Sequence, residues 1–311
     1  YLQDEIQIAD SALTIIPGIR YDRYDMEANV DALLDGTNLV AGFGYPVEDF
    51  DDGEVSLSLG ALYDINDTYS LFGQYAEGYR APNFNEANQA FVNLGFGYAV
   101  LPNPEIDAET SDSIELGIRA DYDNAFLSLS VFNNNYEDFI SSNFIGREGQ
   151  LSLYQNQNIQ DVEIQGAELL SYFYLDEQWR LRASIAYARG DNESDDVPID
   201  TVDPLTLVAG LRYDNANGNW GGELLVTAVD KKDRVSSDSV VQPSSYTVVD
   251  LIGDWELGEA LSLRLGIFNL FDEEYAHWQN IQGLNAVSSA DTIANAYQPG
   301  MNVRLGFNVE F

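Results

Sequence analysis

The sequence has no cysteine, two methionines and a single histidine, His277, among its 311 residues. Without cysteine, a disulfide scaffold is excluded. No G-x-S-x-G motif and no phosphate-binding loop is present, so we predict no catalytic residues and no enzyme activity. No apolar run reaches 18 residues, which excludes a transmembrane helix of the usual kind. The lack of such a run does not exclude a membrane β-barrel, because only alternate residues of its strands are apolar.

Basic residues are also scarce. The chain has 14 Lys plus Arg against 52 Asp plus Glu, and its formal net charge is −38. A nucleic-acid partner is excluded, because phosphate binding needs a basic surface. Acidic residues gather at 48–54 and at 191–200, and neither run has the spacing of an EF-hand loop. We interpret both as solvated loops, with divalent-cation binding as the alternative.

The last eleven residues, 301–311, alternate completely between apolar and polar positions. The apolar positions are Met301, Val303, Leu305, Phe307, Val309 and Phe311. This period of two predicts a β-strand with one apolar face. The length matches the roughly 9–11 residues that a tilted strand needs to cross a bilayer.

Similar segments recur along the whole chain, and the connections between them alternate between short and long. We predict thirteen strands, at about 2–9, 12–26, 54–65, 67–79, 111–122, 124–139, 159–175, 177–189, 204–215, 219–231, 245–256, 260–270 and 299–311. The long connections fall near 27–53, 80–110, 140–158, 190–203, 232–244 and 271–298. Short turns at one end and long loops at the other are typical of bacterial outer-membrane barrels. The fold prediction is therefore an all-β, transmembrane antiparallel β-barrel in the outer membrane of a Gram-negative bacterium. Its long loops would be extracellular, its C-terminus periplasmic, and outer-membrane lipid would contact its apolar face.

The arginines within these strands lie at non-apolar positions. They are Arg20, Arg119, Arg180, Arg182, Arg212, Arg264 and Arg304. An arginine facing lipid at mid-bilayer would cost a few kcal/mol, so we predict that they face the lumen. As partners we expect inward carboxylates such as Glu115, Asp121 and Glu310.

Two short motifs flank the predicted loop at 80–110. The first is Tyr79-Arg80-Ala81-Pro82, and the second is Asn103-Pro104-Glu105-Ile106. The chain resembles the TonB-dependent outer-membrane receptors, most closely their haem and haemoglobin receptor branch, which carries Phe-Arg-Ala-Pro and Asn-Pro-x-Leu boxes on one loop. The run Gln165 to Ala167, the segments IDTVDPL and NLFDEEY, and YQPG before the last strand extend the resemblance over essentially the whole chain.

The resemblance implies a larger barrel closed by an N-terminal plug domain that contacts the TonB complex. We expect residues 1–311 to form the C-terminal part of that barrel, about 13 strands. The plug and the first strands would precede residue 1. Haem would be a transported ligand and not a permanent cofactor.

The resemblance also suggests ligand-binding residues. We expect these to be Tyr79, Arg80, Ala81, Pro82, Tyr98, Asn103, Pro104 and His277. Haem iron is held by imidazole or by a tyrosine phenolate in known proteins. The family's usual histidine between the two boxes is missing here. Tyr98 and His277 are therefore the candidate iron ligands, and no other metal site is assigned.

Four functions remain open on the sequence. The leading hypothesis is active, TonB-dependent uptake of haem, or of haem released from an extracellular haem protein. The second keeps the machinery but takes a ferric siderophore or another iron complex. The third is a passive porin, and the fourth is a soluble acidic β-protein such as a secreted hydrolase, in which carboxylate pairs would act.

Overall fold

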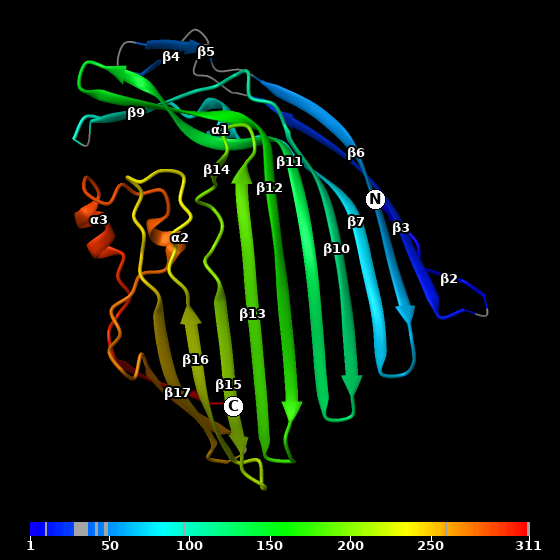
Figure 1. Ribbon diagram of the computed structural model, residues 1–311. Coiled ribbons are helices and arrows are strands. Elements are labelled where there is room, and N and C mark those ends of the chain that lie inside the picture. The colour runs from blue at the N-terminus through cyan, green and yellow to red at the C-terminus, as the bar shows by residue number, and fades with distance from the viewer. Residues whose placement is uncertain are drawn as a thin grey trace.

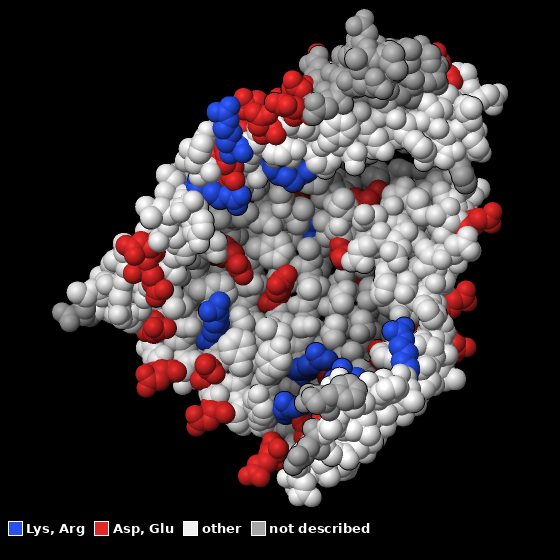
Figure 2. Space-filling view, turned by 180° about the vertical axis from the view of Figure 1, so that it is seen from behind, with Lys and Arg blue, Asp and Glu red and all other residues white. Residues whose placement is uncertain are grey.

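The computed structural model describes residues 1–9, 11–27, 37–40, 43–46, 49–95, 97–258 and 260–309. Its main element is one 17-stranded sheet, and β4 (Thr37–Val40) pairs separately with β5 (Phe43–Pro46). The sheet curves into a wall that is hollow on one side (Figure 1, Figure 2). The prediction of an all-β fold is confirmed.

The wall is a sequence of neighbouring antiparallel strands. In chain order they are β1 (Leu2–Gln3), β2 (Ile6–Gln7), β3 (Leu13–Met26), β6 (Phe50–Asp64), β7 (Tyr69–Arg80), β10 (Glu109–Tyr122), β11 (Ala125–Glu148), β12 (Leu151–Tyr174), β13 (Trp179–Asn192), β15 (Thr206–Asp214), β16 (Trp220–Val229), β17 (Tyr246–Glu256), β18 (Leu261–Phe268) and β19 (Asn302–Val309). The short pieces β1 and β2 both pair with β3 and occupy one line. Within the described residues the wall has thirteen lines of strand, which match the thirteen predicted.

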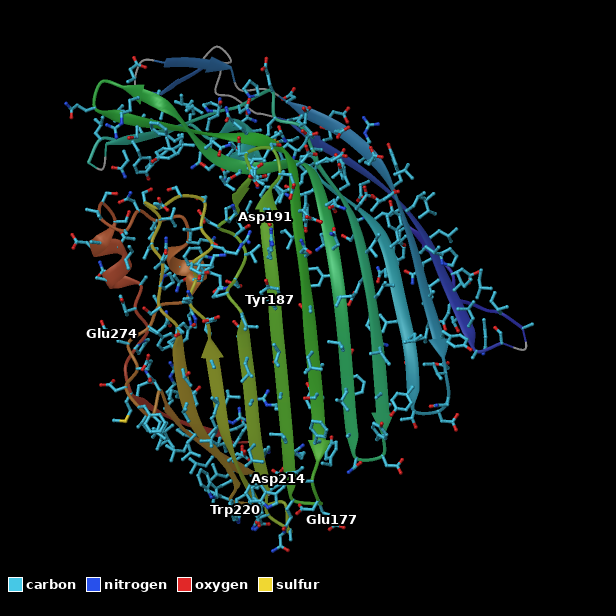
Figure 3. All side chains as sticks on the ribbon, viewed as in Figure 1. Glu177, Tyr187, Asp191, Asp214, Trp220 and Glu274 are labelled. Atoms are coloured by element: carbon cyan, nitrogen blue, oxygen red, sulfur yellow. The ribbon has the colours of Figure 1, made fainter. Side chains whose placement is uncertain are left out.

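The short turns lie together at one end of the wall, where Glu177, Asp214 and Trp220 are found (Figure 3). Side-chain oxygens close several of them. The carboxylate of Asp176 accepts hydrogen bonds of 2.8 Å from the backbone nitrogens of both Gln178 and Trp179. Asn66 does the same for the two residues 68 and 69. Local bonds of this kind favour Asp and Asn in tight turns. The predicted turn residue Asp10 lies outside the described residues.

The other end of the wall carries the long connections and the remaining elements (Figure 1). These are α1 (Phe84–Asn88), β8 (Phe91–Asn93), β9 (Tyr98–Leu101), β14 (Val197–Pro198), α2 (Trp278–Ile281) and α3 (Ala290–Asn295). Each of the described helices is too short and too polar to cross a bilayer.

The predicted long loop at 140–158 is wrong. Strands β11 and β12 continue through it, and their ladder runs on to Glu148 paired with Leu151. The hairpin turns at Gly149, whose φ of +57° suits glycine. This part of the hairpin lies beyond the apolar band of the wall. Its strands therefore lack the apolar–polar alternation on which the prediction depended.

The two faces of the wall differ as predicted. On β10, Ile114, Leu116 and Ile118 are exposed on the outer face, while Ser113 and Glu115 face the hollow side. The last strand likewise exposes Val303, Leu305 and Phe307. The predicted strand residues Glu310 and Phe311 lie outside the described part of the chain.

The inward arginines find partners other than those predicted. Arg182 pairs with Glu223 at 2.7 Å, Arg180 pairs with Asp214 at 2.5 Å, and Arg212 bridges Asp214 and Asp254. The guanidinium groups of Arg119 and Arg304 lie instead over the rings of Phe72 and Phe268. Charged side chains of both signs are visible in the hollow of the wall (Figure 2). The pairing with Glu115 and Asp121 was wrong because the alternation assigns a face and not a neighbour. The acceptor of Arg180 lies on the adjacent strand, and those of Arg182 and Arg212 lie two strands away or, for Asp214 beside Arg212, at position i+2.

The wall ends at β19 on one side and at β1 and β2 on the other. In the described residues β19 pairs with β18, β1 and β2 pair with β3, and no ladder joins the two edges. The two chain ends lie apart in Figure 1, with the C-terminus at the short-turn end.

Candidate functional site

The Tyr79–Pro82 box is held by an ion-pair network. Arg80 lies 2.9 Å from Glu86 and 2.8 Å from Glu109, whose side chain is buried. The same Glu109 oxygen accepts a bond from the backbone nitrogen of Ile140. Arg80 thus joins the start of α1 to β10 and β11. Pro82 is fully buried beside it, and Ala81 is half-buried.

The helix that follows begins with a capping box. Asn83 accepts hydrogen bonds from the backbone nitrogens of residues 85 and 86, and the Glu86 carboxylate returns to the Asn83 nitrogen. Satisfying the free N–H groups in this way is the usual reason a short helix begins where it does. Tyr79 donates a 3.1 Å bond to Asp52 on β6, which a phenylalanine at this position would lack.

The Asn103–Pro104 box packs against the same helix. The backbone nitrogen of Asn103 donates to the carbonyl oxygen of Ala87 at 2.8 Å, and its side-chain amide donates to the carbonyl oxygen of Asn156 at 2.8 Å. Asn156 donates in turn to the Glu86 carbonyl oxygen. Pro104 is half-buried. The two boxes, 21 residues apart in the chain, are therefore held on one scaffold with β12.

Above the boxes stands a small sheet that we call the canopy. It comprises β8, β9 and Leu94 between them, with the upper residues 139–148 of β11 and 151–158 of β12. Strand β9 lies parallel to β12, with Tyr98 opposite Ser152. At Asp138 the backbone of β11 takes a positive φ of 56°, and the canopy sweeps over the long-connection end (Figure 1).

Tyr98 lies within an aromatic cluster of the canopy. Its ring centroid is 6.0 Å from that of Phe91 and 6.3 Å from that of Tyr154. Phe144 touches the far side of Tyr154 at 5.8 Å. The predicted neighbour Phe96 lies outside the described residues. Tyr98 is thus brought together with aromatic side chains, and it is not among the residues that line the cavity beside His277.

His277 borders a cavity of about 520 Å³ between the wall and the last long connection. Small and apolar side chains of β13, β15 and β16 line it, together with the carboxylates Glu168 and Asp203. The ring of Tyr275 meets the imidazole edge-on, with centroids 5.4 Å apart. Tyr246 stacks on Tyr275 at 4.6 Å. Tyr187, which also contributes to the lining, lies midway along β13 (Figure 3).

Behind this cavity, three long connections are fixed to one another. Trp278 is 4% exposed and packs with Val240, Ala276 and Ile281. The Lys232 ammonium lies 5.3 Å from the Trp278 ring centroid and donates a 2.7 Å bond to the carbonyl oxygen of Val202. Burial lowers the pKa of the Lys232 ammonium, and Asp200 offsets part of that shift.

The acidic run at 191–200 takes part in this structure. Asp191, at the upper end of β13 (Figure 3), pairs with Arg189 at 2.8 Å and with Arg234. Asp200 accepts 2.9 Å and 2.6 Å bonds from Ser236. Across the described ranges no group of three or more acidic or histidine side chains is placed to hold a metal ion. The other run, at 48–54, lies partly outside them.

Sequence reasoning missed several residues of this region. Glu109, Asn156 and Tyr275 were not predicted as site residues, and the contact between Lys232 and Trp278 was not predicted either.

Comparison with known proteins agrees with this architecture. A family model described as "TonB dependent receptor-like, beta-barrel" matches residues 1–270. A probable haemoglobin and haemoglobin–haptoglobin-binding protein of Haemophilus influenzae is 27% identical over 82% of this chain and 29% of its own length. A haemoglobin–haptoglobin utilization protein of Neisseria meningitidis is 25% identical over 91% of this chain and 39% of its own.

Solved structures give the same fold. A copper transporter has a TM-score of 0.81 at 23% identity, over 97% of this chain and 46% of its own. A ferric enterobactin receptor of Pseudomonas aeruginosa has a TM-score of 0.71 at 22% identity, over 99% and 44%. The prediction of a β-barrel is confirmed. The chain spans less than half the length of each of these relatives and structures.

Proposed function

Because the chain belongs to the TonB-dependent receptor family and forms part of the receptor's β-barrel, we propose that it imports haem, either free or released from a haem protein. A barrel of this family lies in the outer membrane of Gram-negative bacteria. Membership of the family therefore favours a receptor over the two other hypotheses, a passive porin and a soluble hydrolase. The relatives named for haemoglobin binding support haem as the ligand.

The observation that carries the proposal is the position of His277. The only histidine of the chain borders a cavity of about 520 Å³ with a largely apolar lining. That volume lies in the usual range for small-molecule sites. Neutral imidazole is a common axial ligand of haem iron, and an apolar surround favours the porphyrin. Tyr275 and Trp278 fix the backbone on both sides of the histidine.

The charges of the cavity define how haem would enter. Glu168 and Asp203 line it and would repel the haem propionates. The propionates would therefore point out of the cavity, and the porphyrin edge without them would enter first. Tyr98 lies in the canopy and outside this cavity, so it would be the alternative iron ligand only where His277 is not the ligand.

The machinery of import follows from the family. We propose that residues 1–311 are the C-terminal part of the barrel, with the plug and the first strands N-terminal to them. The plug would contact the TonB complex. The long connections would face the outside of the cell, and the C-terminus would face the periplasm.

A ferric siderophore or another iron complex is the second candidate. It is favoured by the lack of any histidine between Asn83 and Pro102, where the haem branch carries one. A siderophore brings its own iron ligands, so it would need no protein imidazole.

A haemin titration of the full-length receptor in detergent, followed by the Soret absorbance, tests the proposal. We expect saturable binding that weakens about tenfold or more, with an altered Soret maximum, on His277→Ala. Val287→Ala, in the same connection and 86% exposed, is the matched control. Haemin binding that ignores His277→Ala would assign the iron to another ligand, with Tyr98→Phe as the next variant. No haemin binding, with saturable binding of a ferric siderophore, would contradict haem import.

A further inference from the structure

The canopy is nearly free of charge. Residues 87–104 contain no Asp, Glu, Lys or Arg, and residues 139–158 contain only Arg147 and Glu148. In the whole chain 21% of residues are charged, and the net charge is −38. Figure 2 is turned by 180° from Figure 1, so the canopy, at the upper left of Figure 1, lies at the upper right of Figure 2. The described surface there is almost all white.

Its exposed residues are of a particular kind. Leu94 is 78% exposed and Phe144 is 55% exposed, with Phe91 and Ile145 also open to solvent. On the same two strands Ser142 is exposed, and the Ser, Asn and Gln side chains at 141, 143 and 152–158 are half-buried. Aromatic and amide side chains with few charges are typical of protein–protein contact surfaces.

The canopy stands well beyond the apolar band of the wall. Strand β11 has 24 residues, whereas roughly 9–11 residues suffice to cross a bilayer. The canopy part of β11 is about 30 Å long at the rise of a β-strand. It lies at the long-connection end, where β4 and β5 stand farther out (Figure 1), so a large ligand approaching that end reaches the canopy and these strands before the wall.

The canopy is also held in place before any ligand arrives. Gln155 donates a 2.7 Å bond to the carbonyl oxygen of Pro102, and Asn158 donates to the carbonyl oxygens of Asp107 and Asp138. These bonds fix β12 to the box loop. A surface ordered in advance loses less conformational entropy on binding, which favours affinity.

We propose that the canopy is the docking surface for the protein component of a haem-protein ligand. The partner presents a weakly charged patch of apolar and amide groups, because a strongly acidic patch would be repelled by the rest of the chain and a basic one would bind its acidic loops instead. The inference rests on the proposed function, which supplies a haem protein as the ligand.

The test uses the full-length receptor in detergent, with haemoglobin and haemin as separate probes. Leu94→Asp and Phe144→Asp place a charge on the canopy, and Val287→Asp is the matched control at an exposed apolar residue outside it. We expect haemoglobin affinity to fall about tenfold or more in the two canopy variants and to hold in the control. Haemin affinity should stay within about twofold in all three variants, because the cavity beside His277 is untouched.

Salt dependence is the second readout. Docking through uncharged groups should change haemoglobin affinity less than about threefold between 50 and 500 mM NaCl, whereas docking on acidic loops should weaken steeply. A receptor that binds haemoglobin equally well with a charged canopy overturns the inference and leaves haem import standing, as does a receptor that binds haemin but no haemoglobin. A receptor that binds neither probe overturns the proposed function, and the inference falls with it.

Discussion

The indole nitrogen of Trp278 donates a 2.7 Å hydrogen bond to the backbone carbonyl oxygen of Asp200, 78 residues earlier in the chain. The carboxylate of the same Asp200 accepts bonds from Ser236. One point therefore joins the connections after β13, β16 and β18. It also forms the back of the cavity that His277 borders.

Trp278→Phe should loosen these three connections together. The substitution removes the bond to Asp200 and weakens the contact with Lys232, a loss of about 1–2 kcal/mol. We expect faster trypsin cleavage at Lys231 and Arg234 in the folded receptor, measured by gel and mass spectrometry. Trp220→Phe, at a 40% exposed tryptophan of the short-turn end, is the control. Equal cleavage rates in both variants would contradict the role of Trp278.

The wall was predictable because lipid imposes a period of two on every strand that crosses it. Ile114, Leu116 and Ile118 reveal that period, and Asp176 marks the turn that follows two strands later. The upper hairpin of β11 and β12 was not predictable in this way. Both of its faces meet water or other loops, so Asn143 and Gln155 occupy a strand with no apolar stripe to reveal it.

The sequence predicted where the candidate site lies better than it predicted what its residues contact. The two boxes located the loop, yet the contacts of Arg80 and Asn103 are with the protein's own scaffold. Whether these residues also contact a ligand stays a prediction. Glu109 and Trp278 carry no periodic signal, since each acts through tertiary contacts that only the folded chain creates.

Gly166→Ala should destabilise the wall. A Cβ at Gly166 would lie 2.6 Å from Cζ of Phe132 and would collide with the backbone carbonyl oxygen of Tyr187. The strand backbone cannot yield, so we expect a loss of about 1–3 kcal/mol. Heat-modifiable gel migration of the full-length receptor measures it as a lower transition temperature.

Gly306→Ala is the matched control for that substitution. It lies in β19, and a Cβ there meets no described atom within 4 Å. Its transition temperature should hold or rise slightly, because alanine restricts the unfolded chain more than glycine does. A lower temperature for Gly306→Ala than for Gly166→Ala would contradict the packing at β12.

Arg80→Gln should detach the box loop from the wall. It leaves the buried Glu109 without its cation, although the exposure of Arg80 limits the cost to about 1–3 kcal/mol. We expect hydrogen exchange of residues 84–105 to rise, measured by mass spectrometry. Arg23→Gln breaks an exposed pair with Asp51 and should change stability by less than about 0.5 kcal/mol. Unchanged exchange in the Arg80 variant would show that the network does not hold the loop.

Lys232 should make the connections at the long-connection end more stable at alkaline pH. Burial lowers the pKa of its ammonium in the folded protein, with Arg234 acting in the same direction and Asp200, Asp203 and Asp233 opposing. At pH values below the lowered pKa both states carry the proton, and the folded state bears the full cost of burying the charge. As pH rises toward the ordinary value of about 10.4, the unfolded chain binds more protons than the folded one, so stability increases.

Lys232→Met removes the group that titrates while keeping a side chain of similar length. The rise in stability between about pH 8 and pH 10 should then be smaller than in the unaltered receptor. The measurement is the rate at which the connections are cleaved by a protease that does not cut at lysine and is active across that range. Lys231→Met is the control, because that neighbour is exposed and pairs with Asp233. Asp233 raises the pKa of Lys231, so the contribution of Lys231 changes only above the ordinary lysine pKa of about 10.4, and Lys231→Met should leave the rise between about pH 8 and pH 10 in place. If the two variants showed the same pH profile, the charge of Lys232 would not determine how the stability of these connections depends on pH.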